Sequence, residues 1–180
     1  MHQFLRTDAV EKGFILTLIQ NFALCYPGVH FILRNDNKVI ADYPRASTDE
    51  QRLEIVLGKK FLDNAVPISK DGKGLSLTGF IGLPSFVHST TSKQYIFVNG
   101  RAVKDKQIYA CIKPAYANIM TGGGHPALVL HLKIDPYEID VNVHPSKAEV
   151  RFRDSYSVKS FVISTIRERL RNLREKHQVI

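Results

Sequence analysis

Apolar residues return every three or four positions in four stretches of the chain, which is the spacing that places them on one face of an α-helix. The helices predicted in this way cover residues 8–26, 48–58, 105–120 and 154–176. Asp8 with Glu11, and Thr48 with Gln51, have the spacing of capping boxes at the first two helix starts. Pro114 lies inside the third helix and should kink or split it, because proline lacks an N–H and clashes with the preceding turn.

Shorter stretches between the helices alternate or are continuously apolar, and these predict strands. The predicted strands cover residues 29–35, 39–43, 65–69, 75–82, 94–98, 127–134, 138–143 and 149–152. Residues 84–92 are rich in Ser and Thr and are interpreted as a mobile loop, and residues 121–126 as a flexible glycine-rich connection. Because hairpins and helices mix without a regular βαβ alternation, we predict an α+β fold with helices packed on one face of a mixed sheet.

The composition suits one soluble domain. Of 180 residues, 44% are hydrophobic and 23% are charged, which is enough apolar material to build a core. We find no internal repeat and no domain boundary, so we predict a single domain over residues 1–180. The formal net charge of +8 is compatible with nucleic acid binding, although many basic proteins bind none. Without a signal peptide or a long apolar run, the chain is expected to be intracellular and outside the membrane.

Little in the sequence indicates a metal site or a catalytic nucleophile. Cys25 and Cys111 belong to no CxxC or Cys/His cluster, and each falls in an apolar helical pattern where a free cysteine acts as a small hydrophobe. The seven histidines are scattered without metal-ligand spacing, and His144 is interpreted as a structural residue. We therefore predict no metal site.

The first candidate functional stretch is residues 140–152, with the sequence DVNVHPSKAEVRF. Two apolar strands bracket a polar turn that Pro145 closes, so Lys147 is held at a bend. A lysine presented in this way can act as a point charge toward a phosphate. On spacing alone, an ordinary solvent-exposed lysine is the simpler interpretation.

The second stretch is residues 94–103, QYIFVNGRAV, in which a strand runs into an Asn-Gly turn that tolerates positive φ. Arg101 projects from this turn, and Lys104 and Lys106 follow at the start of a predicted helix. Three cations there could cradle a phosphate backbone. A solvated turn explains the same residues at least as simply.

The final helix is basic on its polar side. Its cations are Lys159, Arg167, Arg169, Arg171, Arg174 and Lys176, and they outnumber Glu168 and Glu175. This is either a solvated face or a DNA-facing surface in which Arg167 and Arg171 add non-specific phosphate contacts to that of Arg101.

The segments FVNGR at residues 97–101 and DVNVHPSKAEVRF at residues 140–152 together closely resemble the paired signatures of MutL-type DNA mismatch repair proteins. Their order and their separation of roughly forty residues also agree. The resemblance implies the fold of domain 2 of ribosomal protein S5, placed after an ATPase domain of the kind shared with gyrase, Hsp90 and histidine kinases. It implies that Lys147 reaches the γ-phosphate of ATP in that neighbouring domain and that Arg101 binds DNA. Asn142, His144 and Pro145 match the residues that shape the lysine turn.

The resemblance also implies what the chain lacks. The ATPase box, the C-terminal dimerisation domain and the endonuclease metal motif of some members are not found, so no hydrolysis and no cofactor are expected for this chain alone. The longer protein is expected to be a bacterial, cytoplasmic and nucleoid-associated ATPase that uses ATP and Mg²⁺. Its expected partners are DNA, MutS and other mismatch repair proteins, and a second copy of itself in a homodimer. A general nucleic-acid-binding module of the S5-like fold, without nucleotide coupling, is the alternative.

Overall fold

The computed structural model describes residues 8–120, 122–140 and 150–177, and the chain divides into two compact units, residues 1–63 and 64–180. The sequence shows no linker between them because one residue, Asn64, separates the last helix of the first unit from the first strand of the second. The predicted mixed sheet belongs to the second unit alone. That both units form one S5-like domain stays a prediction.

The first unit combines three helices with one hairpin. Its elements are α1 (Asp8–Cys25), β1 (Phe31–Asn35), β2 (Lys38–Tyr43), α2 (Asp49–Leu57) and α3 (Lys59–Asp63). Thr48 caps α2 as predicted, since its hydroxyl accepts from the Gln51 backbone N–H at 3.2 Å. The sequence analysis missed α3, which begins directly after Gly58 ends α2 with a φ of 88°.

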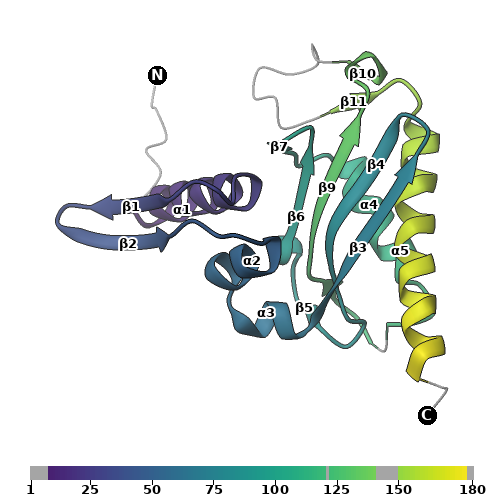
Figure 1. Ribbon diagram of the computed structural model, residues 1–180, viewed down its shortest axis with the longest axis horizontal. Coiled ribbons are helices and arrows are strands. Elements are labelled where there is room, and N and C mark those ends of the chain that lie inside the picture. The colour runs from purple at the N-terminus through teal and green to yellow at the C-terminus, as the bar shows by residue number, and fades with distance from the viewer. Residues whose placement is uncertain (1–7, 121, 141–149, 178–180) are drawn as a thin grey trace, which may run out of the picture. The chain divides into compact units, whose positions relative to one another are not determined.

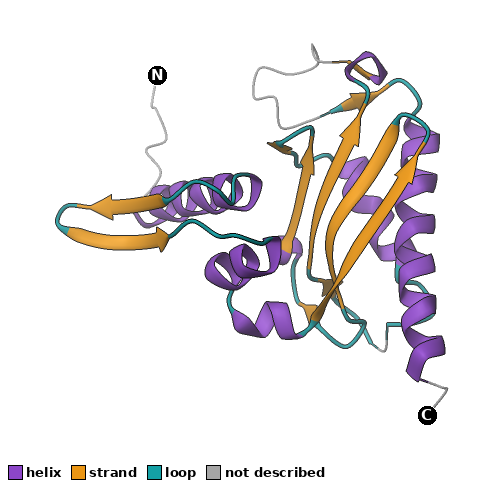
Figure 2. Ribbon diagram, viewed as in Figure 1, coloured by secondary structure: helices purple, strands orange, loops and turns teal. Residues whose placement is uncertain are grey.

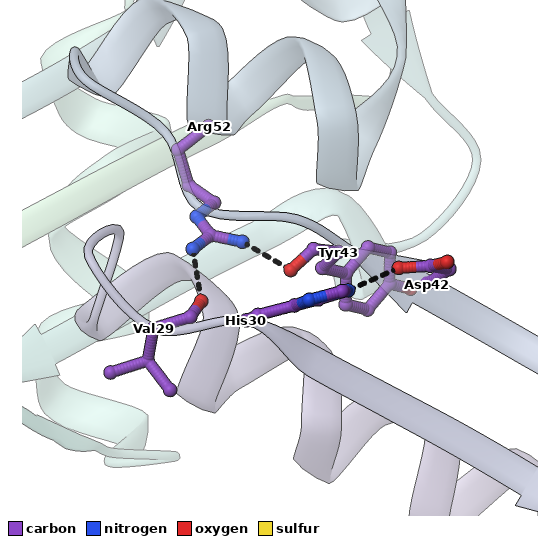
Figure 3. Close-up of polar contacts among 5 residues, drawn as sticks. All are labelled: Val29, His30, Asp42, Tyr43 and Arg52. Carbon is purple, nitrogen blue, oxygen red and sulfur yellow. Dashed lines mark hydrogen bonds and ion pairs between the residues drawn. The ribbon is translucent and has the colours of Figure 1, made fainter.

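One buried cation holds the first unit together (Figure 3). Arg52 of α2 is only 2% exposed, and its guanidinium donates to four backbone carbonyls. Nη1 bonds the Tyr43 oxygen at 3.2 Å, while Nη2 bonds the oxygens of Tyr26 at 3.2 Å, Val29 at 2.6 Å and Pro27. Burial lowers the pKa of Arg52 from its usual value. The side chain thus joins α2 to the segment after α1 and to the end of β2.

The apolar stripe that predicts α1 is exposed in the structure. Val10, Leu18 and Phe22 are each 44–54% exposed, and Ile32 and Val39 of the hairpin are exposed to a similar extent. The spacing identified the helix correctly, but this face is not buried among the described residues. A large exposed apolar patch is typical of an interaction site.

The second unit contains most of the strands and two long helices. Its elements are β3 (Ala65–Gly72), β4 (Leu75–Gly82), β5 (Val87–His88), β6 (Gln94–Val98), β7 (Arg101–Ala102), α4 (Lys106–Ala115), β8 (His125–Pro126), β9 (Leu128–Ile134), β10 (Ile139–Asp140), β11 (Arg151–Phe152) and α5 (Ser155–His177). The Asp154 carboxylate accepts from the Ser157 N–H at 3.0 Å, so it caps α5 as predicted.

A five-stranded sheet in the order β3-β4-β9-β6-β7 forms the centre of this unit. β6 and β9 run parallel, whereas the other neighbours are antiparallel. Helices α4 and α5 cover one face (Figures 1 and 2), where apolar side chains of β4, β6 and β9 meet those of the helices. Gly79 of β4 permits the close approach of β9, since an added Cβ would lie 2.0 Å from the Val129 oxygen. The predicted α+β fold with a mixed sheet and helices on one face is confirmed.

One helix prediction and one loop prediction are corrected. α4 ends at Ala115 and does not extend to residue 120, so Pro114 sits in the last turn of a helix that stops instead of kinking. The loop predicted over residues 84–92 contains β5, which pairs with β8 through His88 and His125. Two-residue strands are too short for alternation to reveal them. No helix of the described residues is long and apolar enough to cross a membrane.

We expect Arg52→Met to lower the free energy of unfolding of the first unit by about 3 kcal/mol or more, because four backbone carbonyls, in one buried and three part-buried bonds, lose their donor. Urea denaturation followed by circular dichroism, with hydrogen exchange in β1 and β2, measures the loss. Arg34→Met, at an exposed position of β1, serves as the control and should change stability by about 0.5 kcal/mol or less. Equal effects of the two substitutions would contradict the role assigned to Arg52.

Candidate nucleic-acid interface

The turn between β6 and β7 presents Arg101. Asn99 and Gly100 have φ values of 48° and 76°, so both central residues adopt positive φ, as in a type I′ hairpin turn. Arg101 pairs with Val98 across the hairpin and is exposed. The structure therefore agrees with the prediction that this Asn-Gly turn projects Arg101 from the end of a buried strand.

The side chain of Asn99 fixes this turn to the neighbouring strand. Its Nδ2 donates to the Ile134 oxygen at 3.0 Å, and its Oδ1 accepts from the Ile134 N–H at 3.0 Å. The Asn99 backbone N–H also donates to the Leu132 oxygen at 2.9 Å. These bonds continue the parallel pairing of β6 with β9 beyond the last residue of β6. Sequence reasoning assigned Asn99 to the turn alone and missed this contact.

Lys104 and Lys106 lie on the exposed segment after β7, one on each side of a helix cap. Asp105 is 8% exposed, and its Oδ1 accepts from the backbone N–H groups of Gln107 at 2.8 Å and Ile108 at 3.1 Å. The carboxylate is thereby engaged in starting α4. Three exposed cations thus follow one another along a short, anchored segment.

Lys147, which is predicted to contact a nucleotide, lies outside the described residues, as do Asn142, His144 and Pro145, which are predicted to shape its turn. The strands on either side of residues 141–149 are described. β10 pairs antiparallel with β11, joining Ile139 to Phe152 and Asp140 to Arg151. β10 follows β9, whose last residue is held by Asn99, so the β10–β11 pair lies at the sheet end that carries the Arg101 turn (Figure 1).

Arg167 and Arg171 lie elsewhere. Both are exposed on α5, which is tied to the edge strand β3 by Arg169 Nε donating to the Pro67 oxygen at 2.7 Å and by the Lys70–Glu168 ion pair at 2.6 Å. β7 forms the opposite edge. With roughly 4.8 Å between neighbouring strands, the two edges lie roughly 19 Å apart. The structure therefore does not bring the α5 cations together with Arg101, and Arg169 contacts the sheet.

Burial disfavours the thiolate form of both cysteines. Both are free thiols, and burial raises the pKa of Cys25 to about 11 and also raises the pKa of Cys111. The described residues contain no group of three His, Cys, Asp or Glu side chains that could hold a metal ion. The candidate site in the described residues therefore consists of exposed cations.

The family model described as "DNA mismatch repair protein, C-terminal domain" matches residues 53–171. The chain belongs to the MutL family of DNA mismatch repair proteins. The MutL protein of Rhizobium leguminosarum bv. trifolii (strain WSM2304) is 41% identical over 169 residues, which cover 93% of this chain and 28% of that protein. The chain thus spans little more than a quarter of the length of this curated relative.

Solved structures share the fold. The crystal structure of the N terminal domain of a DNA repair protein superposes with a TM-score of 0.76 at 22% identity, covering 93% of this chain and 55% of that one. The Aquifex aeolicus MutL ATPase domain complexed with ADP gives a TM-score of 0.55 at 22% identity, covering 74% of this chain and 46% of that one. At these identities the likeness concerns the fold alone, and it agrees with the predicted S5 domain 2-like class.

We expect Asn99→Gly to lower the free energy of unfolding of the second unit by about 1–2 kcal/mol, because it keeps the positive φ but removes both side-chain bonds to Ile134. Asn99→Ala should cost about 1 kcal/mol more, since alanine must also adopt that backbone conformation. Gly100→Ala isolates the backbone cost, because an added Cβ there meets nothing within 4 Å. Thermal and urea unfolding measure all three. If Asn99→Gly leaves stability unchanged, the two bonds do not anchor the turn.

Proposed function

We propose that this chain is the part of a MutL mismatch repair protein that contacts both a nucleotide in a neighbouring ATPase domain and DNA. Lys147 contacts the γ-phosphate of ATP, and Arg101 with Lys104 and Lys106 contacts the DNA backbone. The observation that carries the proposal is the shared location of the Arg101 turn and of the strands on either side of residues 141–149. Asn99 joins the Arg101 turn to Ile134, the last residue of β9, and the β10–β11 pair follows β9 at the same end of the five-stranded sheet (Figure 1).

The nucleotide contact has a simple physical basis. A lysine ammonium is a compact point charge, and a lysine supplied from outside the ATPase domain gains its partner only while the γ-phosphate is present. Docking of the two domains then depends on the nucleotide, which is a local electrostatic event with a global readout. Asn142, His144 and Pro145 shape the turn that presents Lys147. The exposed apolar stripe on α1 supports a neighbour packed against the first unit.

The DNA contact rests on exposed cations with anchored backbones. Arg101, Lys104 and Lys106 bind phosphates and therefore read no base sequence. Arg167 and Arg171 add phosphate contacts from a separate place on α5. Binding should consequently weaken as the salt concentration rises.

In this proposal, the longer protein is an ATPase that binds ATP and Mg²⁺ in the neighbouring domain. It forms a homodimer and acts with MutS and other repair proteins. It is located in the bacterial cytoplasm, at the nucleoid. This chain alone does not hydrolyse ATP. A general nucleic-acid-binding module without nucleotide coupling is the second candidate. It is favoured by the exposure of Arg101, Lys104 and Lys106, whose placement requires no neighbouring domain.

Replacing Lys147 with Ala in the longer protein, with its ATPase domain, should lower the rate of ATP hydrolysis by about tenfold or more, because the γ-phosphate loses the positive charge that contacts it. A steady-state phosphate-release assay measures the rate. Lys93→Ala, at an exposed lysine outside both motifs, is the matched control and should leave it unchanged. Undiminished hydrolysis by the Lys147 variant would favour the module without nucleotide coupling.

Charge reversal at Arg101 tests the DNA contact. We expect Arg101→Glu to weaken duplex DNA binding by about tenfold at low salt and to lower the slope of log affinity against log salt by about 1. Arg34→Glu makes the same change of charge at an exposed site in the first unit. Fluorescence anisotropy with a labelled duplex compares the two. Equal losses would show that only the overall charge matters, which would contradict a site at Arg101.

A further inference from the structure

A groove lies between the end of α4 and α5, and cations line it. Its volume is about 1170 Å³, and Lys159, Arg167, Arg171 and Arg174 of α5 contribute their side chains. The other wall comes from Ala115, the last residue of α4, and from Ala117, Asn118 and Ile119 of the turn that follows it.

The cations form a row. A helix rises by 1.5 Å per residue, so Lys159 and Arg174 lie roughly 22 Å apart along α5. Arg167, Arg171 and Arg174 follow one another at intervals of four and three residues, which places them on one helix face. This length suits an extended polyanion, and it corresponds to a short single-strand site of about four nucleotides.

The charges of the groove are only partly compensated. Glu168 also lines it, but its carboxylate is engaged by Lys70 Nζ at 2.6 Å, and that contact lowers the pKa of Glu168. Arg167 donates one N–H to the Pro114 oxygen at 3.0 Å, which holds the two walls together. Within the part of the chain that the structure describes, Arg171 and Arg174 form no ion pair with a carboxylate. Two carboxylates, Glu168 and Glu175, line the groove, and the charge of Arg171 also helps to lower the pKa of Glu168.

Apolar and aromatic side chains accompany the cations. Ala115, Ile119 and Ile163 give the groove an apolar part, and Tyr156, 81% exposed, lies at the α5 N-terminal side. Such a surface suits flat bases, whose faces stack on aromatic rings while their phosphates meet cations. A duplex lying along the same row would keep its bases stacked inside, so it would leave Tyr156 and the apolar part uncovered.

We propose that this groove binds a single strand of DNA, with phosphates on Arg171, Arg174 and Lys159 and a base on Tyr156. The inference rests on the proposed DNA-binding function and deepens it, because it assigns a second site and a strand state to it. The Arg101 turn lies at the opposite edge of the sheet, so the two sites engage different stretches of nucleic acid.

The test uses the 180-residue chain and a fluorescent oligothymidylate of about twelve nucleotides, with a duplex of equal length as the second probe. R171E/R174E should weaken oligothymidylate binding by about tenfold and lower its salt slope by about 1.4, since each lost phosphate contact contributes about 0.7 for a single strand. The control K93E/K113E makes the same change of net charge at exposed lysines outside the groove and should alter affinity by about twofold or less. Circular dichroism verifies that both variants are folded.

Tyr156 separates stacking from charge. Tyr156→Ala should weaken oligothymidylate binding by about fivefold or more, whereas Tyr156→Phe should retain it, because stacking needs the ring and not the hydroxyl. Neither substitution should change duplex binding. If the Tyr156 variants lose affinity for the oligothymidylate and for the duplex equally, the groove is a general polyanion surface and not a single-strand site. The same conclusion follows if poly-glutamate displaces the oligonucleotide at the same charge concentration.

The outcomes also separate this inference from the proposed function. If Arg101→Glu weakens duplex binding while R171E/R174E matches its control, the groove proposal fails and the Arg101 contact stands. If only the groove variants lose affinity, the groove stands and the Arg101 contact fails. If the chain binds neither probe, both proposals are wrong.

Discussion

The parallel pairing of β6 with β9, extended by the side chain of Asn99, is the constraint on which the candidate interface depends. β6 ends in the turn that presents Arg101, and β9 leads into β10, after which residues 141–149 begin. Because Asn99 bonds both the N–H and the oxygen of Ile134, the two segments cannot separate without losing a two-point contact. The motif proposed to contact DNA thus follows β6 directly, and the strand that precedes the motif proposed to contact a nucleotide follows its partner β9.

The sequence predicted helices and strands correctly wherever apolar periodicity was strong. It did not predict which surfaces are buried, because long-range contacts determine burial. β4 and β6 have the predicted bounds, and the stripe of Val158, Val162, Ile166 and Leu170 is buried on α5 as its spacing implies. Periodicity could not show that the stripe on α1 is exposed, because burial depends on what covers a helix. Nor could it show that Arg52 is buried among carbonyls, since a lone arginine in a helix resembles any surface cation.

The cations of the chain lie on separate surfaces with different surroundings. Arg101, Lys104 and Lys106 lie near the β7 edge on a short anchored segment, whereas the α5 cations border a groove that apolar side chains also line. Arg169, although it is part of the same basic run, is bound to β3. Counting cations along a helix therefore overestimates the number that face a ligand, because the face that packs on the sheet uses some of them.

The central claim is that Lys147 couples this domain to the nucleotide state of its neighbour. The most direct measurement is a crystal structure of the longer protein, including its ATPase domain, with a non-hydrolysable ATP analogue and again with ADP. We expect the Lys147 Nζ to lie within about 3 Å of a γ-phosphate oxygen in the ATP-analogue complex. In the ADP complex, Lys147 should make no such contact. A Lys147 side chain directed to solvent in both complexes would contradict it.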